Sequence, residues 1–168
     1  MSFSLIPEFR LSSFREVDAD FLEQHNVRGI LLDIDNTLEP YENPVPTEEL
    51  LLWFSMLQEH GVRAAFVSNN GASRVTLFNR DLQLPAYPRA WKPLKRSLLR
   101  AMEEIGTAPE QTIFMGDQIY TDVFAAHNAG LRAILVNPIR DRRDPITFVK
   151  RLLERPVLRA YEKRNLSK

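Results

Sequence analysis

Short apolar runs, each separated from the next by about one helix of sequence, constrain the fold of this chain more than any other feature. The clearest runs lie at residues 27–32, 63–67, 112–115 and 132–136. Their length and near-continuous apolar character are typical of strands that are buried on both faces. Strands that alternate with single helices predict a parallel sheet with right-handed crossovers. We therefore expect an α/β fold, a Rossmann-like three-layer sandwich with a mainly parallel sheet.

The segments between these runs carry helical periodicity and helix boundary signals. We expect helices at residues 47–60, 72–81, 94–105 and 121–128, and a short extended segment at residues 86–91. Thr47 is a good first residue for its helix, because Glu48 and Glu49 then lie in the first turn, where acidic side chains are favourable. Beyond Pro138 the sequence becomes basic and helical, with an interruption expected at Pro156.

Composition indicates one globular domain. The 168 residues, 44% of them apolar, suit a single unit over residues 1–168, with a core at about 27–140 and a basic helical tail at 145–168. The absence of cysteine excludes disulfides, thiol catalysis and thiolate zinc sites. No apolar run is long enough to span a membrane, and the first residues lack the apolar region of a signal peptide. We therefore expect a cytoplasmic protein without a transmembrane segment.

Charge is unevenly distributed although the formal net charge is zero. Residues 1–60 carry 12 acidic and 3 basic side chains, whereas residues 140–168 carry 10 basic and 4 acidic ones. The basic tail would suit an anionic membrane surface or an acidic partner, which would make the protein peripheral at the membrane. A solvated helix face, neutralised by the acidic part of the same domain, explains the pattern equally well. We expect no nucleic acid partner.

Polar side chains follow the predicted strands where each strand ends. Two carboxylates, Asp33 and Asp35, come directly after the first run, and ionised Asp is rarely buried without a partner. Ser68 follows the second run, Lys92 the extended segment, and Asp117 the third run. The carboxyl ends of parallel strands meet at one edge of a sheet, and ligands bind there. These residues should therefore converge.

This set of residues suits phosphoryl transfer. A phosphomonoester dianion resists attack by an anion unless its charge is neutralised, so Mg²⁺ held by carboxylates and a nearby lysine are natural requirements. A carboxylate can attack phosphorus and form an aspartyl-phosphate intermediate, which divides hydrolysis into two easier steps. The sequence thus predicts a magnesium-dependent phosphoryl-transfer centre.

Four motifs carry a resemblance to a known family. The stretches DIDNT, VSNN, WKP and GDQIYTD occur in this order, and together they resemble the four motifs of the haloacid dehalogenase (HAD) superfamily phosphatases. The resemblance implies that Asp33 is the nucleophile and Asp35 the general acid and base. It also implies that Ser68, Asn69 and Lys92 bind the phosphate.

The resemblance further implies a Mg²⁺ site and two supporting residues. Its ligands would be Asp33, the backbone carbonyl of Asp35, and Asp117. Asp122 would support either the metal or Lys92, and Thr37 would support the first motif. The phosphorylated substrate would then be held between the metal and the lysine.

Over nearly the whole chain, the similarity is closer to the YqeG-type phosphatases, which are related to mitochondrial phosphatidylglycerophosphate phosphatases. This relationship implies phosphatidylglycerophosphate, or another bulky phosphoester, as the substrate. Only 30 residues separate Thr37 from Ser68, and 23 separate Ser68 from Lys92, so there is no room for a cap domain. An open site would admit a lipid head group at a membrane surface, unless a partner protein or a second copy of the chain supplies a lid.

Other interpretations of the same residues remain open. Asp33 and Asp35 could cap a turn, Ser68 could be a turn residue, Lys92 a solvated loop residue, and Asp122 a helix cap. A receiver-like phosphoacceptor domain uses similar residues, but there the lysine should follow the acceptor aspartate, whereas Lys92 precedes Asp117. A noncatalytic adaptor with a HAD fold, binding a partner protein, is the third alternative.

Overall fold

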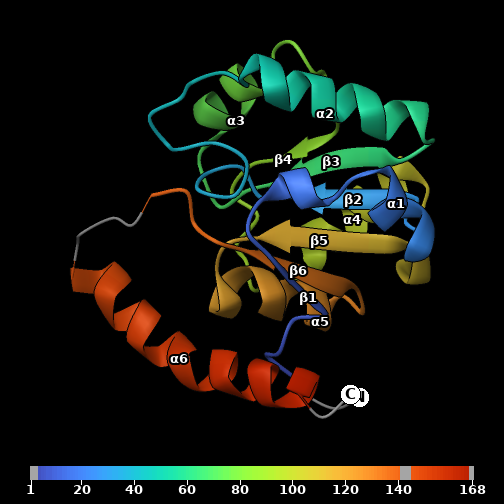
Figure 1. Cartoon of the computed structure of the whole chain (residues 1–168). Coiled ribbons are helices and arrows are strands. Elements are labelled where there is room, and N and C mark those ends of the chain that lie inside the picture. Colours follow the sequence, from blue (N-terminus) through green and yellow to red (C-terminus); the bar gives the residue numbers. More distant parts are fainter. Residues whose placement is uncertain (1–3, 141–144, 167–168) are drawn as a thin grey trace.

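A six-stranded sheet in which every strand pair is parallel forms the centre of the protein (Figure 1). The computed structural model describes residues 4–140 and 145–166. The strands, in chain order, are β1 (Phe9–Leu11), β2 (Gly29–Leu32), β3 (Arg63–Val67), β4 (Ala86–Tyr87), β5 (Thr112–Gly116) and β6 (Arg132–Val136). Their order across the sheet is β1-β6-β5-β2-β3-β4. The predicted parallel α/β fold is confirmed.

Helices cover both faces of this sheet. They are α1 (Ala19–Gln24), α2 (Glu48–Glu59), α3 (Ala72–Phe78), α4 (Arg96–Ile105), α5 (Phe124–Asn128) and α6 (Pro145–Leu166), with 3₁₀ turns η1 (Phe14–Glu16) and η2 (Pro109–Gln111) and a π-helical turn η3 (Ile119–Val123). Buried residues of α1, α2 and α3 belong to one apolar cluster, and those of α4, η3 and α5 belong to another. The molecule therefore has three layers.

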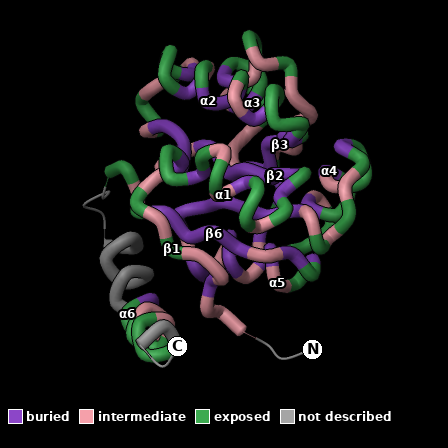
Figure 2. Tube along the Cα trace, turned by 45° about the vertical axis from the view of Figure 1, so that its right-hand side comes forward, coloured by how far each residue is buried: buried purple, intermediate pink, exposed green. Residues whose placement is uncertain are grey.

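Alternation along the strands explains the two clusters. In β2, Ile30 and Leu32 join the cluster under α2, whereas Leu31 joins the cluster under α4. Successive side chains of a strand point to opposite faces, so an uninterrupted apolar run supplies both cores at once. Figure 2 shows the result as buried strands under more exposed helices. Within the described part of the chain, no helix is long and apolar enough to cross a bilayer.

Residues before position 27, where the core was expected to start, also belong to the sheet and to its apolar core. β1 pairs with β6, and Phe14, Val17 and Leu22 are buried in the cluster under α2. The three-residue strand is too short for its pattern to be recognised, and Arg10 interrupts it. Its edge position is decided by pairing with β6, which lies more than 100 residues later in the sequence.

The C-terminal helix differs from its prediction. α6 continues through Pro156, so the expected interruption there is wrong. Val157 and Leu158 pack against the cluster under α4, and burial of this apolar surface offsets the roughly 3 kcal/mol that an internal proline costs a helix. The helix lies along the lower edge of the molecule in Figure 1. Residues 141–144 and 167–168 of the basic tail lie outside the described residues.

The direction of the strand order reverses at β2. From β2 the chain proceeds to β3 and β4 on one side, then crosses to β5 and β6 on the other side. Ligands in open parallel sheets bind outside the carboxyl ends of the strands at such a reversal. Single helices connect β2 to β3 and β3 to β4, and no cap domain is present among the described residues.

Candidate active site

A buried ion triad lies at the carboxyl end of the sheet. The ammonium nitrogen Nζ of Lys92 lies 2.8 Å from Asp33 Oδ1 and 2.8 Å from Asp122 Oδ1. The Lys92 side chain is only 2% exposed, and it also lies over the ring of Phe114, 5.1 Å from the ring centroid. Three residues that are far apart in the sequence thus share one buried charge cluster.

Asp117 completes a group of carboxylates that could hold a metal ion. Oxygens of Asp33, Asp117 and Asp122 all lie within 4.8 Å of one another, and all three residues are buried. Asp33 N donates to Met115 O at 3.0 Å, which holds the end of β2 against β5 just before Asp117. Carboxylate oxygens are the preferred ligands of Mg²⁺, so the donor set fits a divalent cation. The expected ligand set included Asp33 and Asp117 but assigned Asp122 only support.

Gly116 permits the close approach of Asp122. A Cβ atom at position 116 would lie 2.4 Å from both Cβ and Cγ of Asp122. Asp122 lies in η3, and its Oδ2 accepts a hydrogen bond from Gln118 N at 3.0 Å. Single π-helical turns occur frequently at functional sites, because the extra residue in the turn redirects a side chain. Here it presents Asp122 to Lys92.

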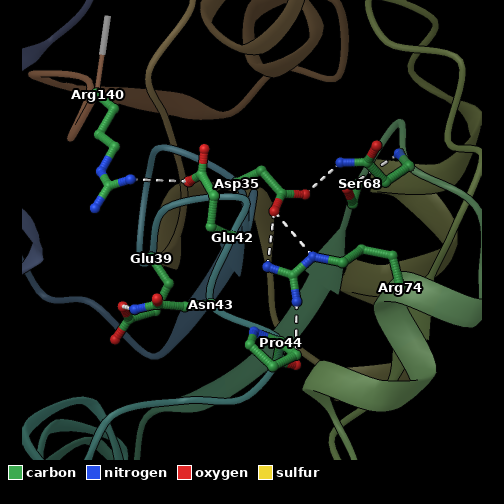
Figure 3. Close-up of polar contacts among 9 residues, drawn as sticks. Asp35, Glu39, Glu42, Asn43, Pro44, Ser68, Arg74 and Arg140 are labelled. Carbon is green, nitrogen blue, oxygen red and sulfur yellow. Dashed lines mark hydrogen bonds and ion pairs between the residues drawn. The ribbon is translucent and has the colours of Figure 1, made fainter. Parts of the chain in front are cut away.

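Asp35 is oriented by two side chains from the region that follows β3. Arg74 donates to Asp35 Oδ1 through Nε at 3.0 Å and Nη2 at 2.8 Å, and Asn70 Nδ2 donates to Oδ2. Arg74 also donates to the carbonyl oxygen of Pro44 at 3.1 Å, which connects α3 to the loop after the first motif (Figure 3). The carboxylate of Asp35 therefore has a fixed direction, with donors on both of its oxygens.

Ser68 and Asn69 lie where the phosphate is expected, at the end of β3. Ser68 is buried, and its Oγ accepts a hydrogen bond from Asn70 N at 3.2 Å. The Asn69 side chain holds the backbone of Lys92 from both sides, accepting from Lys92 N at 2.7 Å and donating to Lys92 O at 3.3 Å. Asn69 thereby positions the lysine, a role that the motif alone did not indicate.

The loop after Asp35 is held by a buried acid that the sequence did not single out. Glu39 accepts hydrogen bonds from Asn43 Nδ2 at 2.8 Å and from Thr47 N at 3.2 Å, so it joins the loop to the start of α2. Figure 3 shows Glu39 and Asn43 on this loop. Thr37 is also buried, and its hydroxyl has no hydrogen-bond partner among the described residues.

The charges of the triad stabilise one another against the cost of burial. Burial raises the pKa of Asp33 to about 6, although the neighbouring Lys92 opposes this rise. For Lys92, burial alone would lower the pKa, but Asp122 and Asp33 outweigh it and hold the pKa above its ordinary value. The lysine is therefore a permanent cation at neutral pH, and Asp33 is ionised beside it.

Known proteins with similar sequences identify the family. A family model described as HAD-hydrolase-like matches residues 90–145. A probable phosphatase, YqeG of Bacillus subtilis, is 33% identical over 159 residues, which cover 95% of this chain and 92% of the relative. The chain belongs to the haloacid dehalogenase superfamily. This membership confirms the predicted enzyme class, a phosphatase, and it gives no support to a receiver-like phosphoacceptor.

Solved structures of HAD proteins share the fold. A subfamily III A hydrolase from Legionella pneumophila aligns with a TM-score of 0.53 at 15% identity, covering 81% of this chain and 78% of that one. The cobalt-bound deoxy-D-mannose-octulosonate 8-phosphate phosphatase from Haemophilus influenzae aligns with a TM-score of 0.53 at 16% identity, covering 83% and 91%. At these identities the likeness concerns the fold alone, and it agrees with the parallel sheet described above.

Sequence reasoning missed the residues that position the site. Arg74 and Glu39 lie outside the four short motifs, and Arg74 and Asn70 both act on Asp35, which lies 39 and 35 positions away from them in the chain. Among them, only Asn70 had a local signal, because it lies within the VSNN stretch. The predicted site residues themselves all lie at the carboxyl edge of the sheet or in the loops that follow it.

Proposed function

We propose that this protein is a Mg²⁺-dependent phosphomonoester phosphatase that works through a phosphoaspartyl intermediate on Asp33. The observation that carries the proposal is the Lys92 ammonium held 2.8 Å from both Asp33 and Asp122, within a cluster of three buried carboxylates. A lysine in contact with a nucleophilic carboxylate keeps it ionised and attracts a phosphate dianion to it. A noncatalytic adaptor would have no need for these costly buried charges.

The chemistry divides between the two aspartates of the first motif. An oxygen of Asp33 attacks phosphorus, and the bond from phosphorus to the leaving oxygen breaks as Asp35 gives that oxygen a proton. Asp35 then takes a proton from water, which attacks the phosphorus of the aspartyl phosphate, releases inorganic phosphate and restores Asp33. In the described structure, Asn70 and Arg74 donate hydrogen bonds to the two Asp35 oxygens and so orient this carboxyl group.

Other residues of the chain bind and orient the phosphate. Ser68 Oγ and the backbone at Asn69 would contact its oxygens, and Lys92 would neutralise part of its charge. Asp33 and Asp117, with the backbone carbonyl of Asp35, would hold Mg²⁺, and the carboxylate of Asp122 lies close enough to join them. When bound, Mg²⁺ would neutralise charge on the phosphate oxygens as the reaction proceeds.

The specific substrate we propose is phosphatidylglycerophosphate, processed in the cytoplasm at a membrane surface. Support comes from the sequence resemblance and from a site that no cap domain covers among the described residues. A partner protein or a second copy of the chain could supply a lid. In a screen with Mg²⁺, phosphatidylglycerophosphate in mixed micelles should be hydrolysed in preference to sugar phosphates, nucleotides and phosphopeptides. Equal or better turnover of soluble esters would exclude the lipid as the substrate.

The reaction itself is tested by removing the nucleophile. Asp33→Asn should abolish Mg²⁺-dependent hydrolysis of phenyl phosphate, because a neutral amide cannot form the aspartyl phosphate, and EDTA should abolish the wild-type activity. Asp81→Asn is the matched control, since Asp81 is exposed and pairs with Arg80 at the surface. Thermal unfolding checks that both variants fold. Full activity in folded Asp33→Asn would refute the assignment.

A further inference from the structure

A pocket next to the ion triad has no role in the steps above. It has a volume of about 570 Å³ and is lined by Asn69, Gly71, Arg89, Trp91, Lys92 and Leu94. These residues come from the loops that follow β3 and β4, at the same edge of the sheet as Asp33. Because Lys92 lines the pocket and its ammonium contacts Asp33, a phosphoester bound at Asp33 would have this pocket within reach of its leaving group.

The apolar part of the pocket is unusually exposed. Trp91 and Leu94 are 72% and 64% exposed, and Trp91 has the largest exposed fraction of the large apolar residues whose burial the structure describes. Trp91 also has a positive φ of 55°, and Arg89 has one of 48°. Such backbone conformations are unfavourable for large side chains and concentrate at ligand sites. The loop thus holds an indole ring in solvent beside the triad, at a cost to stability.

The cationic part of the pocket is available to a ligand. Across the described ranges, no hydrogen bond or ion pair engages the guanidinium of Arg89, in contrast to Arg74, which binds Asp35. The backbone of the loop is nevertheless fixed, because Arg89 N donates to Asn70 O at 2.8 Å and Ala90 N donates to Ser68 O at 2.9 Å. A fixed loop with a free guanidinium is suited to recognise an anion.

We propose that this pocket is a leaving-group subsite for phosphomonoesters that carry a second anionic group on an apolar body. The phosphate to be removed lies at Asp33, the apolar body lies against Trp91 and Leu94, and the second anion, a carboxylate or a further phosphate, binds Arg89. The inference rests on the proposed phosphatase function and adds the chemical class of its substrates.

Four synthetic esters separate the two contacts. Phenyl phosphate and 4-carboxyphenyl phosphate have a ring and differ in the second anion, whereas 3-hydroxypropyl phosphate and propane-1,3-diol bisphosphate repeat this difference without a ring. Arg89→Gln should lower kcat/KM for each anion-bearing ester about tenfold more than for its neutral counterpart, the typical effect of one charged hydrogen bond. Arg89→Lys should restore part of that preference.

A second variant tests the apolar contact. Trp91→Asn introduces a residue that tolerates positive φ and removes the ring. It should lower kcat/KM for the aryl esters about fivefold relative to the aliphatic ones. Each ratio compares variant with wild type on the same ester, so intrinsic differences in leaving-group reactivity cancel. Arg159→Gln and Leu52→Ala are the matched controls, because both residues are exposed and lie on elements that do not line the pocket.

Tryptophan fluorescence provides a readout that does not depend on turnover. The chain has two tryptophans, and Trp53 is buried, with its Nε1 donating to Val17 O at 2.9 Å. Titration with 4-carboxybenzylphosphonate should therefore change the emission of exposed Trp91. Benzylphosphonate, which lacks the carboxylate, should reach the same emission change only at a higher ligand concentration, and so should 4-carboxybenzylphosphonate with the Arg89→Gln variant. The emission change should disappear in Trp91→Asn.

The outcomes distinguish this inference from the proposed function. The subsite is wrong, while the phosphatase function stands, if both variants lower kcat/KM for all four esters equally or leave kcat/KM unchanged for all of them, and if the phosphonates leave the emission of Trp91 unaltered. If no ester is hydrolysed by the wild-type protein, the proposed function fails on these substrates, and the fluorescence titration still decides whether the pocket binds a dianionic aryl ligand.

Discussion

At the scale of single residues, the site depends on a contact that only glycine allows. Gly116 has no side chain, so Asp122 can fold back against β5, and its carboxylate then reaches Lys92. Lys92 in turn contacts Asp33. The three charges are buried together. Removing one of them would leave an uncompensated charge in the interior, and this costs more stability than the intact ion pairs contribute. Gly116 is therefore tied to catalysis although it has no functional group.

We predict that Gly116→Ala impairs both stability and turnover. Its Cβ would overlap Asp122, and overpacking of this kind typically costs about 1–3 kcal/mol. Thermal or urea unfolding measures the stability, and kcat for phenyl phosphate reports the displaced Asp122. Gly71→Ala is the control for stability, since Gly71 has an ordinary φ of −69° and nothing within 4 Å of its Cβ position. Equal stability of the two variants would contradict the prediction.

At the scale of elements, the C-terminal helix α6 supports the turn that carries Asp122. Glu154 of α6 is buried, and its Oε1 accepts a hydrogen bond from Ile119 N at 3.1 Å, at the start of η3. Tyr120 adds a second contact by donating to Leu153 O at 2.8 Å. A carboxylate at the N-terminus of a helical turn satisfies a free N–H group and opposes the local dipole. The tail thus contacts the site as well as solvent.

We expect Glu154→Ala to loosen η3. The Ile119 N–H group would be left buried without this partner, which costs about 1–3 kcal/mol, and kcat should fall because η3 also positions Asp122. Glu162→Ala is the matched control on the same helix: Glu162 is 61% exposed and pairs with Arg10, so its loss should change stability by less than about 1 kcal/mol. Unfolding midpoints and kcat of the two variants decide the matter, and a Glu154→Ala protein indistinguishable from Glu162→Ala would disprove the coupling.

At the scale of the whole molecule, one ion pair joins the N-terminal segment to the far side of the sheet. His127 of α5 contacts Glu8 Oε2 at 3.0 Å, and the same oxygen accepts from Ala133 N at 2.7 Å on β6. For His127, burial and the charge of Arg164 lower the pKa, but the hydrogen bonds to Glu8 and to the Ser4 carbonyl, together with the charge of Glu8, outweigh them, and the pKa is raised above 6.5. For Glu8, burial raises the pKa, but the hydrogen bonds from His127 and from the Ala133 N–H group, together with the charge of His127, outweigh burial, and the pKa lies below 4.5.

The direction of these two pKa shifts predicts how stability depends on pH. The contribution of His127 to the free energy of unfolding is complete below pH 6.5, and it is lost as the pH rises through the raised pKa of His127. The contribution of Glu8 is present above pH 4.5, and it is lost as the pH falls through the lowered pKa of Glu8. His127→Gln should therefore flatten the decline of the urea midpoint between about pH 5.5 and about pH 8.5. His60→Gln, at an exposed position on the end of α2, is the control. An unchanged decline in His127→Gln would show that another group is responsible.

Much of the fold and the chemistry of the site could be predicted because both depend on local patterns. The β2 and β5 runs are recognisable as buried strands, and the parallel arrangement fixes the edge at which Asp33, Lys92 and Asp117 must lie. The positioning residues could not be predicted in this way. Arg74 binds Asp35 across 39 positions, and Glu154 binds the Ile119 N–H across 35, and no periodicity or turn signal encodes such contacts.

The sequence by itself determined the order of strands and helices, the family, and which polar residues follow which strand, because apolar periodicity and short motifs are properties of neighbouring residues. Only the tertiary structure decided that β1 completes the sheet beside β6, that α6 runs unbroken through Pro156, and that Asp122 both contacts Lys92 and lies among the carboxylates, two roles that the family resemblance left as alternatives. Each of these depends on surface buried between segments distant in the chain, where packing outweighs local preference.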